Sequence, residues 1–213
     1  MVTTDDASAG FRPTGFADTR NATAFEMSDP KTQLGVLLAD AVHDKPFSEL
    51  SGVTFHHRGA ELAGHVLIDT LEEAGYTLDD FDAVGALTAA AVPLVTSMIT
   101  AAASRGQDLD GFVMDFVYPS IKGPSIKGRR VILLDSWLSE KSYVQTSSLV
   151  TLRNGNELSL DFGIVGNEGA EILAVAALIG GPFTTLNVVH PVTGEQRELP
   201  FIRAYDESAL RAD

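Results

Sequence analysis

Val131-Ile132-Leu133-Leu134-Asp135 is the stretch that decides the fold of this chain of 213 residues. A short, unbroken apolar run is typical of a strand that is buried on both faces. Strands of this kind occur in parallel sheets whose faces are covered by helices. The run ends in a carboxylate, Asp135, and the next residue is a hydroxyl, Ser136. Polar residues at the end of such a strand are candidates for a ligand site.

Strands and helices alternate along the rest of the chain, which predicts an α/β fold with a parallel sheet flanked by helices. We expect helices from Thr32 onward, over His57–Ala74 and over Val92–Ser104; strands over Phe81–Thr88, Gly111–Val117 and Ile172–Ile179; and a loop over Tyr118–Gly128. Ligands of such sheets bind beyond the carboxyl ends of the strands. The segments after Val84 and after Asp135 are therefore where we expect the site.

Two segments depart from this alternation and predict added β-hairpins. In Leu149–Phe162, apolar and polar residues alternate on both sides of Asn154-Gly155, which is the strongest short hairpin signal. Thr185–Ile202 also predicts a hairpin. Because proline cannot donate a ladder hydrogen bond, Pro191 and Pro200 predict that the strands of this second hairpin lie at sheet edges.

Composition indicates which partners the protein can bind and in which cell compartment it is expected. The net charge of −14 repels nucleic acid and anionic membrane surfaces. The sequence shows no apolar run long enough to span a bilayer and no secretory signal at the amino terminus. The absence of cysteine excludes disulfides and thiolate chemistry, and it is compatible with a reducing compartment. These features predict a cytoplasmic protein that binds neither nucleic acid nor membrane.

The polar, small residues of 1–30 predict a flexible arm, and 31–213 are expected to form a single domain. Isolated histidines and the adjacent pair His56-His57 do not predict a metal site. Neighbouring side chains on a helix or strand point apart, and no ligand cluster accompanies the pair.

Three stretches, in their order and spacing, resemble the orotate phosphoribosyltransferases, particularly those of actinobacteria. They are Val53–Gly64, Asp82–Thr96 with its continuation through Val113, and Gly128–Asp135 rejoined downstream by Glu168–Ala176. The resemblance implies a type I phosphoribosyltransferase fold and usually a homodimer. It also implies a role in pyrimidine nucleotide metabolism, in which orotate is joined to the ribose of phosphoribosyl pyrophosphate (PRPP) with Mg²⁺ on the pyrophosphate.

The resemblance assigns ligand contacts, to a phosphorylated sugar or nucleotide, to two segments. They comprise Leu87, Thr88, Ala89 and Ala90 after one strand, and Asp135, Ser136, Ser139, Glu140, Lys141 and Ser142 after another. In the family two adjacent acids hold the ribose hydroxyls, whereas here only Asp135 remains acidic. The phosphate turn of the family is rich in glycine and opens a helix. Here it has no glycine, Glu140 brings a negative charge, and the predicted hairpin stands where the helix would follow.

Two further elements of the family depart from its pattern. Its mobile loop carries cations that neutralise pyrophosphate, but the matching positions here are Asp115, Phe116 and Pro119. Lys122 and Lys127 are the remaining candidates for that catalytic role. The family's orotate-binding segment has no counterpart before Val53, and alanines replace glycine in the turn after Thr88.

These four losses favour the hypothesis of a non-catalytic or repurposed relative of orotate phosphoribosyltransferase. Two alternatives stay open. The first is an active phosphoribosyltransferase with a changed base, in which Asp135, Lys141, Lys122 and Lys127 carry the chemistry. The second is a dimeric interaction or scaffold protein that uses the family's dimer surface and the extra hairpins.

Overall fold

The computed structural model of the chain describes residues 27–43, 50–115, 117–139, 151–153, 157–159, 162–190 and 192–211. Most of the predicted arm, 1–26, lies outside these residues. Three of the predicted phosphate-turn residues, Glu140, Lys141 and Ser142, also lie outside them. The candidate site is therefore described from the strands and turns on either side of this segment.

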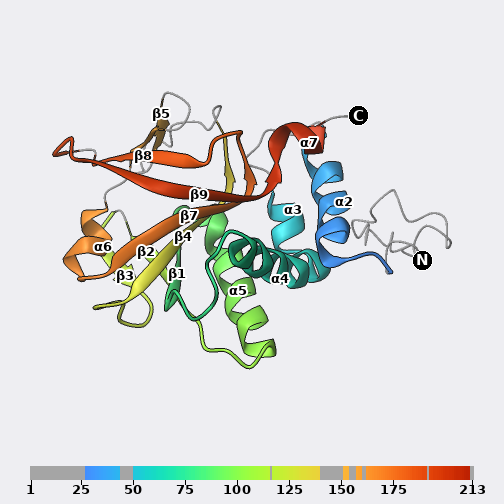
Figure 1. Ribbon diagram of the computed structural model, residues 1–213, viewed down its shortest axis with the longest axis horizontal. Helices are drawn as coiled ribbons and strands as arrows, with labels where there is room; N and C mark the ends of the chain where they lie inside the picture. Colours follow the sequence, from blue (N-terminus) through green and yellow to red (C-terminus); the bar gives the residue numbers. More distant parts are fainter. Residues whose placement is uncertain are drawn as a thin grey trace, which may run out of the picture.

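A nine-stranded sheet forms the centre of the described structure, in the order β3-β2-β1-β4-β7-β9-β8-β6-β5 (Figure 1). The strands are β1 (Ala83–Ala86), β2 (Asp110–Asp115), β3 (Ser120–Lys122), β4 (Arg130–Leu138), β5 (Thr151–Arg153), β6 (Glu157–Ser159), β7 (Glu171–Gly180), β8 (Thr185–Val189) and β9 (Gln196–Asp206). The run β2-β1-β4-β7-β9 is parallel throughout. The predicted α/β fold with a parallel sheet is confirmed.

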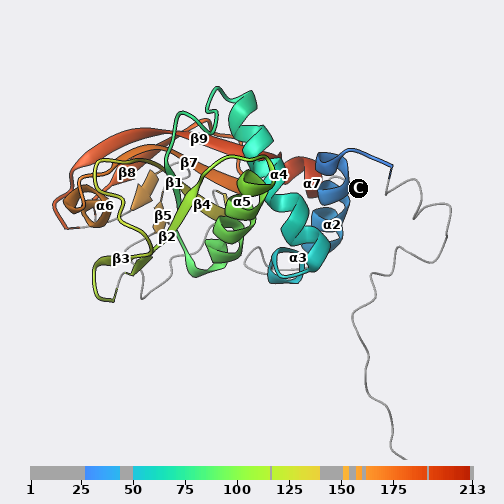
Figure 2. The ribbon, with the colours of Figure 1, turned by 90° about the horizontal axis from the view of Figure 1, so that it is seen from below.

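Four helices, α2 (Pro30–Val42), α3 (Ser51–Thr54), α4 (His57–Glu73) and α5 (Val92–Ser104), lie together on one side of this sheet (Figure 2). Their buried side chains join those of Ile132, Leu134 and Trp137 from β4 in one apolar core. The intervening residues Val131 and Leu133 belong to a second core on the opposite face, together with α6 (Gly163–Asn167). Because consecutive strand residues point to opposite faces, β4 supplies both cores, as its unbroken apolar run predicts.

Both predicted hairpins are present, but the second one lies inside the sheet rather than at its edge. β5 and β6 pair antiparallel with Leu152 opposite Leu158, and β8 pairs antiparallel with β9. The prediction from Pro200 was wrong because β9 changes partner at this residue. β9 pairs with β8 up to Pro200 and with β7 from Phe201 onward, so the missing N–H is tolerated there. Pro191 lies outside the described residues.

The predicted loop over Tyr118–Gly128 contains a short strand. β3 turns back on β2 with Asp115 opposite Ser120. The turn is held by Asp115, whose Oδ1 accepts hydrogen bonds from the backbone N–H groups of Val117 and Tyr118 at 3.0 and 3.1 Å. A carboxylate at the first position of a turn commonly stabilises it in this way.

Helices α4 and α5 approach each other closely at Gly64. A Cβ atom added there would lie 2.2 Å from the carbonyl oxygen of Ser97, whereas one added to Gly52 in α3 would meet nothing within 4 Å. A glycine inside a helix lowers the intrinsic stability of that helix, so its use here reflects the contact with α5.

We expect Gly64→Ala to lower the free energy of unfolding by about 1–3 kcal/mol, because the added methyl group forces the two helices apart. Gly52→Ala is the matched control and should be neutral or stabilising by about 0.5–1 kcal/mol. Urea unfolding of both variants measures the difference. Equal behaviour of the two variants would contradict the close contact.

Candidate functional site

Asp135 lies within β4, not in a loop after it, which corrects the expectation that the strand ends there. β4 continues to Leu138, with Trp137 and Leu138 paired with Ile179 and Gly180 of β7. Only 6% of the surface of Asp135 is exposed. The predicted ribose-binding pair, Asp135 and Ser136, is therefore built into the interior of the sheet.

Thr88 closes over this carboxylate from the neighbouring strand. It follows β1 and precedes a single 3₁₀ turn, η1 (Ala89–Ala91), which leads into α5. A threonine at such a position usually caps the helix with its side chain, but here no cap bond is made. The Thr88 hydroxyl instead donates to Oδ1 of Asp135 at 2.9 Å. The structure thus brings together two of the predicted site residues from segments that are 47 positions apart.

Burial raises the pKa of Asp135 to about 6. Desolvation of the ionised form is the main cause. Hydrogen bonds from the Thr88 hydroxyl and from the backbone N–H groups of Ser136 and Trp137 oppose it. The Ser136 N–H donates to Oδ1 at 2.7 Å. The carboxylate therefore already has hydrogen-bond partners from its own chain.

The side chains of the residues that follow Asp135 are buried. Trp137 packs among the helix-side residues, with the guanidinium of Arg211 5.2 Å from the centre of its ring. Trp137 is therefore part of the apolar core. Ser139 is 2% exposed. Further along, the antiparallel strands β5 and β6 occupy the place where the resemblance implies a helix, as the hairpin signal predicted.

Lys122 stands on the outermost strand of the sheet, far from Asp135. Through the strand register it lies opposite Val113, and Leu134 occupies the same row on β4. Three strand spacings separate Lys122 from β4, which is about 14 Å. Its amine forms an exposed ion pair with Asp115 at 3.7 Å.

Lys127 lies at the other end of the sheet. The next residue, Gly128, donates its N–H to the carbonyl of Gly169, immediately before β7. The amino ends of β4 and β7 meet there, whereas Asp135 belongs to the carboxyl end. The structure therefore does not bring Lys122 or Lys127 to Asp135, and their catalytic role stays a prediction.

The described residues do not fit a Mg²⁺ site. Mg²⁺ takes carboxylate oxygens, usually with phosphate oxygens of the substrate. The second acid of the pair is Ser136 here, and Oδ1 of Asp135 already accepts two hydrogen bonds. Across the described ranges, no group of three His, Asp or Glu side chains is arranged to hold a metal ion.

His56 and His57 do come together, which corrects the premise that adjacent side chains point apart. Their ring centres are 4.3 Å apart. His56 is the N-cap of α4 and has extended backbone angles, so the helical geometry that would separate the rings does not apply to it. The pair lacks a third ligand among the described residues.

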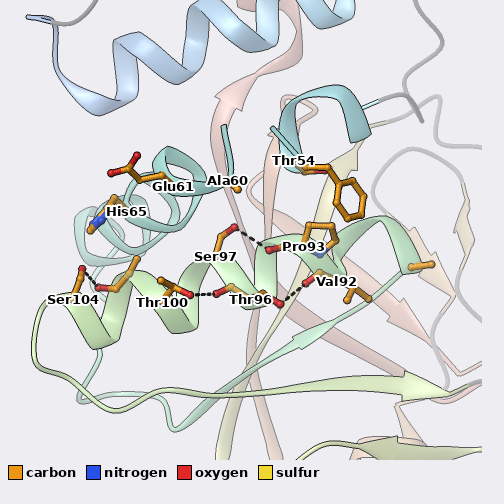
Figure 3. Close-up of a pocket in the computed structure, with 13 residues that line it drawn as sticks. Thr54, Ala60, Glu61, His65, Val92, Pro93, Thr96, Ser97, Thr100 and Ser104 are labelled. Carbon is orange, nitrogen blue, oxygen red and sulfur yellow. Dashed lines mark hydrogen bonds between the residues drawn. The ribbon is translucent and has the colours of Figure 1, made fainter. Parts of the chain in front are cut away.

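A pocket that Asp135 does not line lies among the helices. It is a groove of about 860 Å³ between α3–α4 and α5, lined by residues such as Ala60, His65, Pro93 and Thr96 (Figure 3). Among the residues that line this groove, the sequence analysis selected Ala89 alone, because the others carry no chemical motif. The available signal was the unusual run of uncharged small residues in α5.

No helix in the described part of the chain is long and apolar enough to cross a membrane.

The chain is similar over most of its length to proteins named orotate phosphoribosyltransferase. The chain is 29% identical to an orotate phosphoribosyltransferase of Streptomyces avermitilis over 203 residues, covering 92% of this chain and 99% of that protein. It is also 29% identical to the enzyme of that name from Streptomyces coelicolor, covering 84% of this chain and 88% of that protein. No protein-family model matches the chain.

Solved structures agree in fold. The orotate phosphoribosyltransferase of Mycobacterium tuberculosis, solved in complex with inorganic phosphate, has a TM-score of 0.59 at 20% identity. The match covers 89% of this chain and 95% of the other. The complex of the M. tuberculosis protein with PRPP has a TM-score of 0.56 at 19% identity, over 87% of this chain and 94% of the other.

We predict that Asp135→Asn stabilises the protein at neutral pH. A buried aspartate with a raised pKa contributes stability that is fully present below about pH 4 and is lost as the pH rises through about 6. The amide has nearly the same shape and still accepts from Thr88, but it carries no charge. At about pH 7.5 the variant should be more stable than the wild type by up to about 3 kcal/mol, and the two should converge near pH 4.

Chemical unfolding of both proteins across this pH range tests the prediction. A variant that is less stable than the wild type at neutral pH would mean that the hydrogen bonds of the ionised carboxylate outweigh its desolvation.

Proposed function

We propose that this chain, which is similar to orotate phosphoribosyltransferases and has their type I phosphoribosyltransferase fold, does not synthesise orotidine monophosphate. The protein keeps the fold, while its PRPP and orotate sites no longer support the transfer reaction or bind another ligand instead. Family and fold alone do not determine activity, because activity depends on the residues of the site.

The observation that carries the proposal is the continuation of β4 beyond Asp135. A phosphate turn needs several backbone N–H groups that point at the anion and are free to bind it. Here Ser136 donates its N–H to Asp135, and Trp137 and Leu138 are paired with β7. The backbone that leads from Asp135 to the position of the turn at Ser139 is therefore engaged within the sheet.

The loss of cations supports the same proposal. Transfer of a phosphoribosyl group leaves pyrophosphate, whose charge must be neutralised at the site. In the described chain, the β2–β3 turn places the acid Asp115 where the family resemblance implies a cation, and Lys122 neutralises that acid at the sheet edge. Removing one such electrostatic contact commonly lowers the rate about 10²–10³-fold, and several losses multiply.

A second candidate function rests on Asp135 itself. The acid is retained and hydrogen-bonded at the carboxyl end of the sheet, where ligands of such sheets bind. An altered phosphoribosyltransferase would use it to accept the hydroxyls of a phosphorylated sugar or nucleotide. The M. tuberculosis relative has been solved in complex with phosphate and with PRPP, which makes this ligand class the first to test.

The test measures orotidine monophosphate formed from orotate, PRPP and Mg²⁺, with the S. avermitilis relative as positive control. We expect turnover at least about 10⁴-fold below that of the control, because at least two electrostatic contacts are missing. A rate within about tenfold of the control, abolished by Asp135→Ala, would refute the proposal.

A base panel with pyrophosphate release as readout separates the second candidate from the first. Release with any other base, again dependent on Asp135, would favour an altered phosphoribosyltransferase. Absence of release across the panel would leave the non-catalytic assignment standing.

A further inference from the structure

Thr88 occupies the N-cap position of the turn η1, which leads into α5, without capping it through its side chain. Its backbone has the extended angles of an N-cap, φ −135° and ψ 165°, and its carbonyl accepts from the N–H of Ala91 at 3.1 Å. An N-cap threonine normally also accepts a hydrogen bond on its hydroxyl from the second or third N–H of the helix. No such bond is made here. The second residue of this turn, Ala90, is therefore where a cap bond would form.

Asp135 takes up the Thr88 hydroxyl instead. The hydroxyl donates to Oδ1 of this carboxylate at 2.9 Å. Because the backbone of Thr88 already has the conformation of an N-cap, a change of its χ1 rotamer is enough to bring the hydroxyl to the N–H of Ala90. The hydroxyl thus has two alternative partners, one on the sheet and one on the helix.

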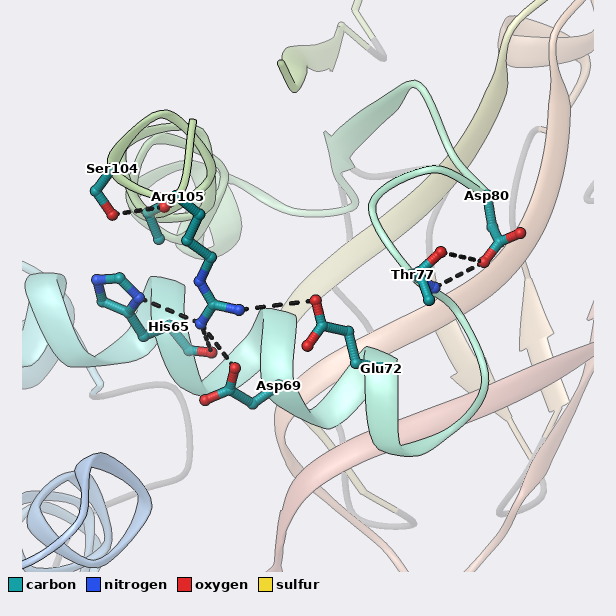
Figure 4. Close-up of polar contacts among 8 residues, drawn as sticks. His65, Asp69, Glu72, Thr77, Asp80, Ser104 and Arg105 are labelled. Carbon is teal, nitrogen blue, oxygen red and sulfur yellow. Dashed lines mark hydrogen bonds and ion pairs between the residues drawn. The ribbon is translucent and has the colours of Figure 1, made fainter. Parts of the chain in front are cut away.

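The other end of α5 is fixed. Arg105, the C-cap of α5, donates to Asp69 at 2.7 Å and lies 3.7 Å from Glu72, both on α4 (Figure 4). Ion pairs thus fasten the carboxyl end of α5 to α4, whereas the side chain of Thr88 leaves the amino end uncapped. A change of partner by Thr88 is therefore a local event at the start of the helix and does not require the helix to move.

The charge of Asp135 decides which of the two partners is the stronger. A hydrogen bond to an ionised carboxylate is roughly twice as strong as one between neutral groups. The ionised carboxylate therefore holds the Thr88 hydroxyl. The neutral acid offers a bond that is comparable with an N-cap bond, and the cap bond also satisfies a free N–H at the helix terminus. Loss of the charge on Asp135 thus favours transfer of the hydroxyl to α5.

Burial brings the titration of Asp135 close to neutral pH. Desolvation raises the pKa of this carboxyl to about 6. The exposed pair of Thr77 and Asp80 shows the contrast (Figure 4). There the Thr77 hydroxyl donates to Asp80 at 2.7 Å, and this bond lowers the pKa of Asp80. The unusual titration of Asp135 therefore comes from its buried position and not from its contact with threonine.

Among the described residues, no neighbouring charge competes with this effect. The stretch Leu87–Ser104 and helix α6 contain no charged residue, and on β7 the residue opposite Asp135 is Ala177. The charges on the flanking strands are already paired with each other, as Arg203 with Asp206 at 3.1 Å and Asp115 with Lys122 at 3.7 Å. Solvation and hydrogen bonding therefore control the charge of Asp135.

We propose that Thr88 is a proton-controlled switch that moves its hydroxyl between Asp135 and the amino end of α5. When Asp135 is ionised, the hydroxyl closes over the carboxylate, as in this structure. When Asp135 is protonated, the hydroxyl caps the helix at Ala90 and leaves Oδ1 open at the carboxyl end of the sheet, where ligands of such sheets bind. The switch regulates access to the candidate site, and it operates whether or not the protein transfers a phosphoribosyl group.

An NMR titration of the full chain between pH 5 and pH 7.5 tests the switch. The side-chain carboxyl carbon of Asp135 reports its ionisation, and the hydrogen-exchange protection factor of the Ala90 amide reports the cap bond. We expect this protection factor to rise about fivefold or more as the pH falls, with the same midpoint as the titration of Asp135.

Four variants separate the switch from a general effect of pH. Thr88→Val removes the hydroxyl at nearly the same shape, and Asp135→Asn removes the titrating group, so both should abolish the pH dependence at Ala90. Thr88→Ser keeps the hydroxyl and should retain that dependence. Thr77→Val removes the matched hydroxyl at the exposed pair and should behave as the wild type does. Thermal melting of each variant verifies the fold.

Three results would overturn the proposal. The first is an Ala90 amide whose protection does not follow the titration of Asp135. The second is a pH dependence at Ala90 that survives in Thr88→Val. The third is an Asp135 that keeps one charge state from pH 5 to pH 7.5. All three are independent of orotidine monophosphate synthesis, so the switch and the proposed function can fail separately.

Discussion

The parallel pairing of β4 with β1 and β7 is the constraint on which the rest of the structure depends. β4 supplies side chains to both apolar cores, and its register with β1 sets the position of Thr88 relative to Asp135. The same pairing with β7 continues past Asp135 to Leu138. One continuous strand therefore organises the fold and also engages the backbone between Asp135 and the position of the phosphate turn.

The buried Asp135 follows from this arrangement. In an open cleft, water or a ligand would satisfy the carboxylate, whereas here a threonine hydroxyl and the N–H of Ser136 do so. Desolvation still raises the pKa of Asp135 to about 6, because burial destabilises the ionised carboxylate. The sheet that buries Asp135 is stabilised by the two cores around it, which is how a single unfavourable group can be retained.

Sequence patterns predicted the elements that depend on local periodicity. The apolar run of β4, the helices α4 and α5, and both hairpins follow from spacing and from turn residues such as Asn154-Gly155. The end of β4 was missed because the unbroken apolar run stops at Asp135 and Ser136 interrupts it, although Trp137 and Leu138 suit a strand. The prediction that Pro200 lies in an edge strand was wrong because the effect of this proline depends on where β9 changes partner, which is a property of the tertiary structure.

The candidate site was predictable in part. Thr88 and Asp135 were selected from their places after two strands, and they do meet. The positions of Lys122 and Lys127 could not be obtained from the sequence. The position of Lys122 depends on the tight turn at Asp115, which pairs β3 with β2. The position of Lys127 depends on the chain returning to the amino end of β4. Apart from Ala89, the lining of the groove on α5 was missed because its signal is an absence of charge rather than a motif.

Amide hydrogen exchange of Ser136, Trp137 and Leu138, with and without PRPP and Mg²⁺, tests the central claim most directly. We predict slow exchange at these amides, like that of the rest of β4, and no change on addition of the ligand. Rapid exchange without ligand, followed by protection of these amides when PRPP is added, would contradict it. That result would mean that the backbone after Asp135 is free to form a phosphate turn.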